Sequence, residues 1–98
     1  MGAFVYILRC ADDSFYIGTT RSTLDQRVAE HNNGKFGGYT ATRRPVALAY
    51  SEFFERIEDA IASERRLKGW SRAKKQALID GEPDRLRALS QRRSGFSD

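Results

Sequence analysis

The chain opens with two short segments that are rich in β-branched and aromatic residues. They are residues 4–8 (FVYIL) and residues 15–18 (FYIG), and the turn-forming residues 11–14 (ADDS) lie between them. β-branched and aromatic side chains favour strands, whereas Asp and Ser favour turns. The pattern therefore predicts an antiparallel β-hairpin near the start of the chain.

The hairpin carries Tyr6 on its first strand and Tyr16 on its second. Side chains alternate between the two faces of a strand, so the number of loop residues decides whether the two tyrosines share a face. An even loop, such as residues 12–13 alone, separates them. An odd loop, such as residues 12–14 with a bulge, places both hydroxyls on one face.

A helix follows the hairpin. Thr23 and Gln26 have the spacing of a capping box, and Asn33-Gly34 is a typical helix end. The apolar positions of this helix are Leu24, Val28 and Ala29. Residues 34–44 are polar and contain glycine, and two interpretations stand: a mobile segment near a ligand, or a plain connector.

The rest of the chain predicts one more strand and three more helices. The strand covers residues 46–50, extended through Phe53, and a helix covers residues 55–68. The apolar positions of that helix are Ile57, Ala60, Ile61 and Leu67. Ser71 caps a helix that runs through residue 79, and Pro83 starts a short last helix.

Together these elements predict an α+β fold, with a small three-stranded antiparallel sheet flanked by helices. A chain of 98 residues is the size of one domain. We expect that domain to cover residues 1–91, and residues 92–98, with little periodicity, to form a frayed tail.

The composition limits the classes of protein. No apolar run approaches the roughly 18 residues that a membrane span needs. The N-terminus lacks the features of a signal peptide, which predicts a cytoplasmic location. Cys10 is the one cysteine and His31 the one histidine, which excludes an internal disulfide and argues against a Cys/His zinc site within the chain.

The charge pattern favours a polyanionic partner. The net charge is +4, and residues 65–75 contain six cations and no acid. One interpretation of this stretch is a solvated helix face. The other is a nucleic-acid platform, in which Trp70 stacks on a base or, alternatively, packs at the helix end. The residues of this platform would be Arg65, Lys68, Trp70, Arg72, Lys74 and Lys75.

Glu64 is an anomaly, because it lies at i+3 from Ile61, i+4 from Ala60 and i+7 from Ile57 in the apolar stripe of its helix. Burying an unpaired carboxylate is costly, so such a residue is normally ion-paired, protonated or bound to a metal. One partner would be an arginine such as Arg27. The alternative is a metal, and a single carboxylate with water and phosphate oxygens suits Mg²⁺ or Mn²⁺.

Arg27 and His31 are four residues apart on the first helix and flank Val28. They therefore point in nearly the same direction, at the boundary of its buried face. This pair could grip a phosphate, because the planar fork of arginine matches phosphate oxygens and keeps its charge. The alternative is a surface arginine and a helix-end histidine.

These segments in this order resemble the GIY-YIG nuclease superfamily. The matching segments are residues 5–7 (VYI), 15–18 (FYIG), 27–32 (RVAEHN) and 64–70 (ERRLKGW). The chain is most similar to small single-domain bacterial members, which resemble the nuclease domain of structure-specific endonucleases that act on branched DNA. The first motif departs from the family pattern, since VYI stands where Gly-Ile-Tyr is usual.

The resemblance implies a role for each of five residues. Tyr6 and Tyr16 would be the motif tyrosines, Arg27 the phosphate-stabilising arginine, His31 an accessory active-site residue and Glu64 the ligand of Mg²⁺ or Mn²⁺. The implied reaction is one-metal hydrolysis of a phosphodiester, in which one of the two tyrosines is the base. We assign Tyr16 as the base and Tyr6 as the residue that orients the water; the alternative exchanges these two roles.

The resulting hypothesis is a metal-dependent DNA endonuclease of DNA repair or recombination, acting on branched or single-stranded DNA. The alternative is a nucleic-acid-binding module without turnover, or a subunit that acts only with a protein partner. Metal dependence separates them, because phosphate binding alone weakens smoothly with salt and needs no specific cation.

Overall fold

The computed structural model describes residues 2–97, and side chains are described for residues 2–90. The chain forms two compact units, Met1–Lys68 and Gly69–Asp98. The first unit contains β1 (Ala3–Arg9), β2 (Phe15–Thr20), α1 (Leu24–Asn32), α2 (Gly38–Ala41), β3 (Ala47–Phe54) and α3 (Ile57–Lys68). The second unit contains α4 (Arg72–Ile79) and α5 (Pro83–Ser97).

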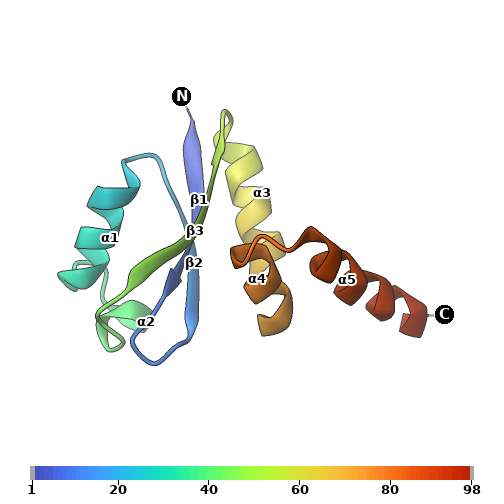
Figure 1. The fold of residues 1–98 in the computed structure, drawn as a ribbon. Helices are drawn as coiled ribbons and strands as arrows, with labels where there is room; N and C mark the ends of the chain where they lie inside the picture. Colours follow the sequence, from blue (N-terminus) through green and yellow to red (C-terminus); the bar gives the residue numbers. More distant parts are fainter. Residues whose placement is uncertain (1, 98) are drawn as a thin grey trace. The chain divides into compact units, whose positions relative to one another are not determined.

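The three strands form one antiparallel sheet in the order β2-β1-β3. In Figure 1 this sheet lies between α1 on one side and α3 on the other. The α+β class and the three-stranded antiparallel sheet with flanking helices are therefore confirmed. In residues 2–97 no helix is long and apolar enough to cross a membrane.

The β1–β2 loop has odd parity. The backbone N–H of Cys10 donates to Ser14 O at 2.8 Å, which leaves residues 11–13 as the loop, and Asp13 has a positive φ of 70°. The resulting register pairs Tyr6 with Gly18 and Leu8 with Tyr16. Because directly paired residues share a face, Tyr6 and Tyr16 lie on the same face of the sheet. This is the geometry that the nuclease hypothesis requires.

The central strand β1 is buried on both faces. Val5 and Ile7 have no exposed surface on the face that carries α3. On the α1 face, Tyr6 and Leu8 belong to a cluster with Cys10 and Val46, against which Tyr16, Leu24 and Val28 pack. The proposed catalytic tyrosine Tyr6 is thus also a core residue, which fixes its ring in place.

Two details of the first helix differ from the prediction. The Thr23 side chain accepts from the Gln26 backbone N–H at 3.2 Å, but the Gln26 amide donates to Glu30 instead of completing a capping box. Ala29 is exposed, and the inward stripe is Leu24, Arg27, Val28 and His31. These residues follow the i, i+3, i+4, i+7 spacing of one helix face, whereas Ala29 lies off it.

The helix α3 also differs from the prediction in one position. Ile61 is 40% exposed, while Ser63 is only 3% exposed. At about 100° per residue, Ala60, Ser63, Glu64 and Leu67 share one side, and Ile61 is turned away from it. Placing Ile61 on the face against the sheet was therefore wrong, but Glu64 does lie along that face.

The predicted loop of residues 34–44 contains the short helix α2. The last helix is longer than expected, since α5 spans Pro83–Ser97 and continues into the segment for which we expected a frayed tail. The side chains of residues 91–97 lie outside the described part of the structure, as does residue 98. A domain boundary at residue 91 stays a prediction.

Candidate active site

Tyr6 lies on β1 with its ring across the neighbouring strand β2. Its side chain is 2% exposed, and its hydroxyl lies 3.1 Å from Nε2 of His31. Gly18 faces this ring, and a Cβ at that position would lie 2.5 Å from Tyr6 Oη and 2.7 Å from Cζ. The absence of a side chain at Gly18 therefore gives the phenol the space that it occupies.

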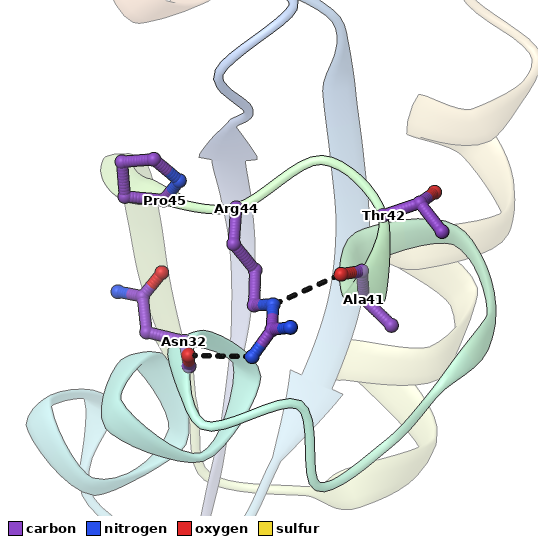
Figure 2. A pocket seen from close by; sticks show the side chains of 5 residues that line it. All are labelled: Asn32, Ala41, Thr42, Arg44 and Pro45. Atoms are coloured by element: carbon purple, nitrogen blue, oxygen red, sulfur yellow. Dashed lines mark hydrogen bonds between the residues drawn. The ribbon is translucent and has the colours of Figure 1, made fainter.

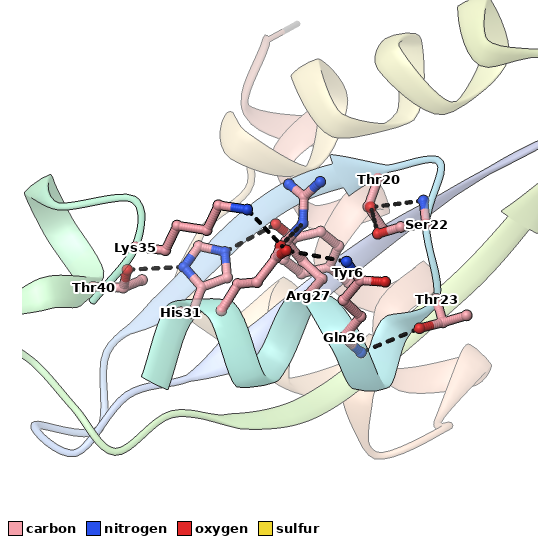
Figure 3. A network of polar contacts seen from close by, with 10 residues as sticks. Tyr6, Thr20, Ser22, Thr23, Gln26, Arg27, His31, Lys35 and Thr40 are labelled. Atoms are coloured by element: carbon pink, nitrogen blue, oxygen red, sulfur yellow. Dashed lines mark hydrogen bonds and ion pairs between the residues drawn. The ribbon is translucent and has the colours of Figure 1, made fainter. Parts of the chain in front are cut away.

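His31 connects Tyr6 to α2. It is 2% exposed, and while Nε2 contacts Tyr6, Nδ1 lies 2.9 Å from Oγ1 of Thr40. Figure 3 shows the imidazole between these two hydroxyls. Burial lowers the pKa of His31, and the nearby Arg27 lowers it further. The ring is therefore neutral at physiological pH. His31 does lie in the last turn of α1, as the alternative interpretation has it, but its side chain is buried against Tyr6 and Thr40.

Tyr16 stands beside His31 on the same face. Its ring meets the imidazole edge-on, with centroids 5.2 Å apart, and stacks on Tyr39 at 6.2 Å. Arg43 lies over the other ring of this stack, 3.9 Å from the centroid of Tyr39, and forms an ion pair with Asp12 at 3.0 Å. Tyr39, on α2, thus packs against the ring of Tyr16, and Arg43 packs on the ring of Tyr39.

Arg27 comes from the inward stripe of α1. Its side chain is 24% exposed, and Nε lies 3.3 Å from Oε1 of Glu30. That ion pair lacks hydrogen-bond alignment, so the buried Nε has no hydrogen-bond partner among the described residues. The guanidinium also lies 4.8 Å from the ring centroid of Phe36. The ion pair with Glu30 is therefore weak, and the guanidinium of Arg27 keeps N–H donors available for an anion.

Burial raises the pKa of Tyr6 to about 12, and the charge of Tyr16 adds to this effect. Arg27 opposes it through its positive charge and a hydrogen bond, and Glu64 raises the pKa further. The phenol therefore keeps its proton at neutral pH.

Glu64 projects from α3 toward β2 on the opposite face of the sheet. Oε1 accepts a short hydrogen bond from the Thr19 hydroxyl, and Oε2 forms an ion pair with Lys68 Nζ at 2.7 Å. Burial opposes ionisation, but the hydrogen bonds from Lys68 and Thr19 outweigh it and lower the pKa of Glu64. Glu64 is thus a charged, ion-paired carboxylate whose partner is Lys68 and not Arg27.

The geometry of Glu64 fits a divalent cation that keeps most of its water. Residues 2–90 contain no cluster of three metal-ligating side chains, so Glu64 would be the one carboxylate. Mg²⁺ accepts such a site, with water and phosphate oxygens as further ligands. The side chain of Glu64 is 21% exposed, and that of Lys68 is 57% exposed. Lys68 can therefore swing away from Oε2 without unfolding the helix.

A hollow of about 440 Å³ lies at the C-terminal ends of α1 and α2 (Figure 2). Arg44 crosses it and donates to Ala41 O at 2.9 Å and Asn32 O at 3.2 Å. Its other lining residues are Thr42 and Pro45. None of the predicted site residues lines this hollow, and Arg44 there joins the ends of α1 and α2.

The predicted nucleic-acid platform is divided between the two units. Arg65 and Lys68 belong to the first unit, whereas Trp70, Arg72, Lys74 and Lys75 belong to the second. Lys68 is held by Glu64, and Lys74 Nζ lies 4.4 Å from the centroid of the Trp70 ring. That contact covers the ring with a cation. The nucleic-acid platform stays a prediction.

The structure adds site residues that the sequence pattern did not indicate. Thr40 contacts His31, Thr19 contacts Glu64, and Phe36 and Tyr39 flank Arg27 and Tyr16. Thr19 could have been found, since strand alternation places it on the face opposite Tyr16 and Gly18. The other three come from the segment between α1 and β3, which has no periodicity from which to infer a face.

Relatives share this sequence over most of its length. A "UPF0213 protein" of Syntrophus aciditrophicus is 40% identical over 84 residues, covering 85% of this chain and 95% of the relative. A second one, from Staphylococcus haemolyticus, is 43% identical over 77 residues, covering 79% and 93%. These matches span nearly the whole of each relative.

Solved structures are also similar. The solution structure of a UPF0213 protein from Bacillus halodurans is 38% identical with a TM-score of 0.55, covering 84% of this chain and 86% of that one. A protein from E. faecalis is 35% identical with a TM-score of 0.57, covering 83% and 85%. Residues 2–77 match the family model described as "GIY-YIG catalytic domain". That span contains both motif tyrosines, Arg27, His31 and Glu64, and the chain therefore belongs to the GIY-YIG catalytic domain family.

Proposed function

We propose that this protein is a divalent-metal-dependent endonuclease that hydrolyses DNA phosphodiester bonds, in DNA repair or recombination. One observation carries the proposal: Tyr6, Tyr16, Arg27 and His31 converge on one face of β1 and β2. The charged Glu64 contacts Thr19 on the other face of β2, and Thr19 is next to Gly18, which lies against the hydroxyl of Tyr6. A cation, a phosphate-binding arginine and hydroxyl groups are what phosphodiester hydrolysis needs.

In this proposal Arg27 binds the scissile phosphate. Its guanidinium is partly exposed, and its ion pair with Glu30 leaves Nε without an aligned acceptor. A phosphate oxygen would supply that acceptor. Because arginine stays protonated at any physiological pH, it also stabilises the charge that develops on the phosphate during attack.

The two tyrosines take different roles. Tyr6 keeps its proton, since its pKa is raised to about 12, so it suits orienting a water by accepting a hydrogen bond. Tyr16 is less buried, and we assign it as the base that takes the proton of the water on Oη. The hydrogen bond to Glu64 raises the pKa of Lys68, and the charge of Tyr16 adds to this effect.

Glu64 would hold Mg²⁺ or Mn²⁺ after Lys68 leaves Oε2. When bound, the cation supplies positive charge at the phosphate and at the departing 3′ oxygen. Thr19 keeps its hydrogen bond to Oε1 and so orients the carboxylate. Metal ligands in proteins are usually oriented by such hydrogen bonds from neighbouring groups. We further propose that Arg65, Lys68, Trp70, Arg72, Lys74 and Lys75 contact the DNA.

The test is cleavage of end-labelled single-stranded, duplex, flap and branched DNA in Mg²⁺, Mn²⁺ or EDTA. We expect cutting that needs the metal and falls by at least about 100-fold in Glu64→Gln, which keeps the shape and removes the charge. The matched control is Glu58→Gln on the same helix, because Glu58 is exposed and pairs only loosely with Arg56 at 3.5 Å.

The binding-module alternative predicts a different result. Folded wild type would then bind DNA with an affinity that weakens smoothly with salt, without cutting any substrate in either metal. Cutting that persists in EDTA, or equally in Glu64→Gln, would contradict the metal role of Glu64.

A further inference from the structure

Thr40, His31 and Tyr6 form a buried series of two hydrogen bonds, and the distances alone do not fix which atom of each pair is the donor. A neutral imidazole has one N–H donor and one lone-pair acceptor, and here each nitrogen faces a hydroxyl that can do either. Nδ1 lies 2.9 Å from Thr40 Oγ1 and Nε2 lies 3.1 Å from Tyr6 Oη. Two arrangements are therefore consistent with the distances, and they give Tyr6 opposite roles.

In the first arrangement Nδ1–H donates to Thr40 and the phenol of Tyr6 donates to Nε2. In the second, Thr40 donates to Nδ1, and Nε2–H donates to the phenol. A phenol is a much stronger acid than an aliphatic hydroxyl, and an aliphatic hydroxyl oxygen is the better acceptor. The first arrangement pairs the stronger donor with the imidazole lone pair and the better acceptor with the imidazole N–H.

The surroundings of Thr40 hold it in place for this role. Thr40 is 2% exposed although it is polar, and it lies on α2. Its carbonyl oxygen accepts from the Arg43 backbone N–H at 3.0 Å, and Arg43 is tied to the hairpin loop through Asp12. The backbone of α2 is thereby anchored next to the sheet, so the hydroxyl of Thr40 stays against Nδ1.

We infer that Thr40 is a positioning residue: it keeps the proton of His31 on Nδ1 and thereby makes the hydroxyl of Tyr6 a donor to Nε2. The kinetic consequence of this assignment rests on the function proposed above. With its proton directed at His31, the oxygen of Tyr6 presents only lone pairs to Arg27 and to a water. Tyr6 then accepts a hydrogen bond from the attacking water, which orients the lone pair of that water toward phosphorus.

The test starts with the ring nitrogens of His31, observed in a long-range ¹H–¹⁵N correlation spectrum of the protein without DNA. The chain contains one histidine, so the signals need no assignment. We expect a protonated Nδ1 and an unprotonated Nε2 in wild type. Thr40→Val has the same shape without the hydroxyl, and we expect it to give a mixture of tautomers. Thr40→Ser should restore the wild-type spectrum.

Cleavage kinetics supply the second measurement. Loss of one oriented hydroxyl should lower kcat about tenfold in Thr40→Val, with KM within about twofold, because the contact acts on the reacting geometry and not on DNA binding. Thr40→Ser should stay within about twofold of wild type. The matched control is Thr42→Val, since Thr42 is exposed and its hydroxyl contacts Arg43 and not His31.

A wild-type spectrum with the proton on Nε2, or a Thr40→Val spectrum identical to wild type, would overturn the inference. An altered tautomer with unchanged kcat would overturn the link to the reaction. If folded wild type cuts no DNA, the proposed nuclease function fails, whereas the spectra still decide the tautomer of His31. A thermal melt of each variant separates these outcomes from simple unfolding.

Discussion

Gly18→Ala tests how the structure places the hydroxyl of Tyr6. Gly18 does not have a positive φ and belongs to the regular strand β2, so alanine can adopt its backbone. The loss of stability in Gly18→Ala therefore comes only from steric overlap. A Cβ would lie 2.5 Å from Tyr6 Oη and 2.7 Å from Cζ, which is about 1 Å closer than ordinary contact. The ring cannot yield easily, because it is buried among Leu8, Cys10 and Val46.

The magnitude follows from three contributions. Overpacking a tight core costs about 1–3 kcal/mol, whereas replacing glycine in a strand returns about 0.5–1 kcal/mol. Moving the ring also breaks the hydrogen bond to His31 and leaves Nε2 unpaired, at about 1–3 kcal/mol. We expect a net loss of about 2–4 kcal/mol, which lowers Tm by roughly 10–25 °C in a domain of this size.

The assay is a double-mutant cycle with Tyr6→Leu, measured by urea unfolding. Leucine lacks the ring atoms that meet Gly18, so Gly18→Ala should cost less than about 0.5 kcal/mol in that background. The coupling between the two positions should therefore approach about 2 kcal/mol or more. The ¹³Cζ chemical shift of Tyr6, followed against pH, gives a second readout. The pKa of the Tyr6 phenol should fall in Gly18→Ala from about 12 toward the ordinary value, because the ring leaves its buried place.

The reasoning is refuted if Gly18→Ala changes Tm by less than about 2 °C, or if it costs the same with and without the Tyr6 ring. Either result would mean that the strand moves to accept the methyl group.

Two further predictions concern pH and metal binding. The pKa of His31 is lowered in the folded state, so the unfolded chain binds the extra proton, and stability should fall as pH drops below about 6.5 at up to roughly 1.4 kcal/mol per pH unit. Urea unfolding between pH 5 and 8 checks this, and His31→Gln should make the free energy of unfolding less dependent on pH. Glu64, whose pKa is also lowered, stabilises the fold across this whole range and loses that contribution only as pH falls below its ordinary value near 4.5. Lys68→Met should raise the affinity for Mn²⁺ about two- to fivefold, because the partly exposed ammonium no longer competes for Oε2. Titration of free Mn²⁺ by electron paramagnetic resonance measures this, and equal or weaker binding than wild type would contradict the fit of a cation at Glu64.

The sequence pattern determined most of the fold. The β-forming runs around Tyr6 and Tyr16 and the strand after Pro45 appear as β1, β2 and β3, and the capping residues Thr23 and Ser71 begin α1 and α4. These features depend on neighbouring residues, so local propensity and periodicity are sufficient to predict them. Ile61 and Ala29 were placed wrongly because apolar identity was given more weight than the angle of each position around its helix.

Part of the candidate site was also predictable, since motif residues in family order indicated Tyr6, Tyr16, Arg27, His31 and Glu64. What tertiary structure decided was how each one is partnered. The parity of the β1–β2 loop placed both tyrosines on one face, and the packing of α3 paired Glu64 with Lys68 instead of Arg27. Thr40 entered the site from a segment without periodicity.

The physical reason lies in the range of the interactions. Strand and helix formation depends on contacts between residues a few positions apart, which the sequence displays directly. The contacts of His31 with Tyr6 and Thr40 join residues 25 and 9 positions apart, and that of Thr19 with Glu64 joins residues 45 positions apart. Such contacts depend on how the chain returns on itself, so protonation and charge at this site follow from the folded structure.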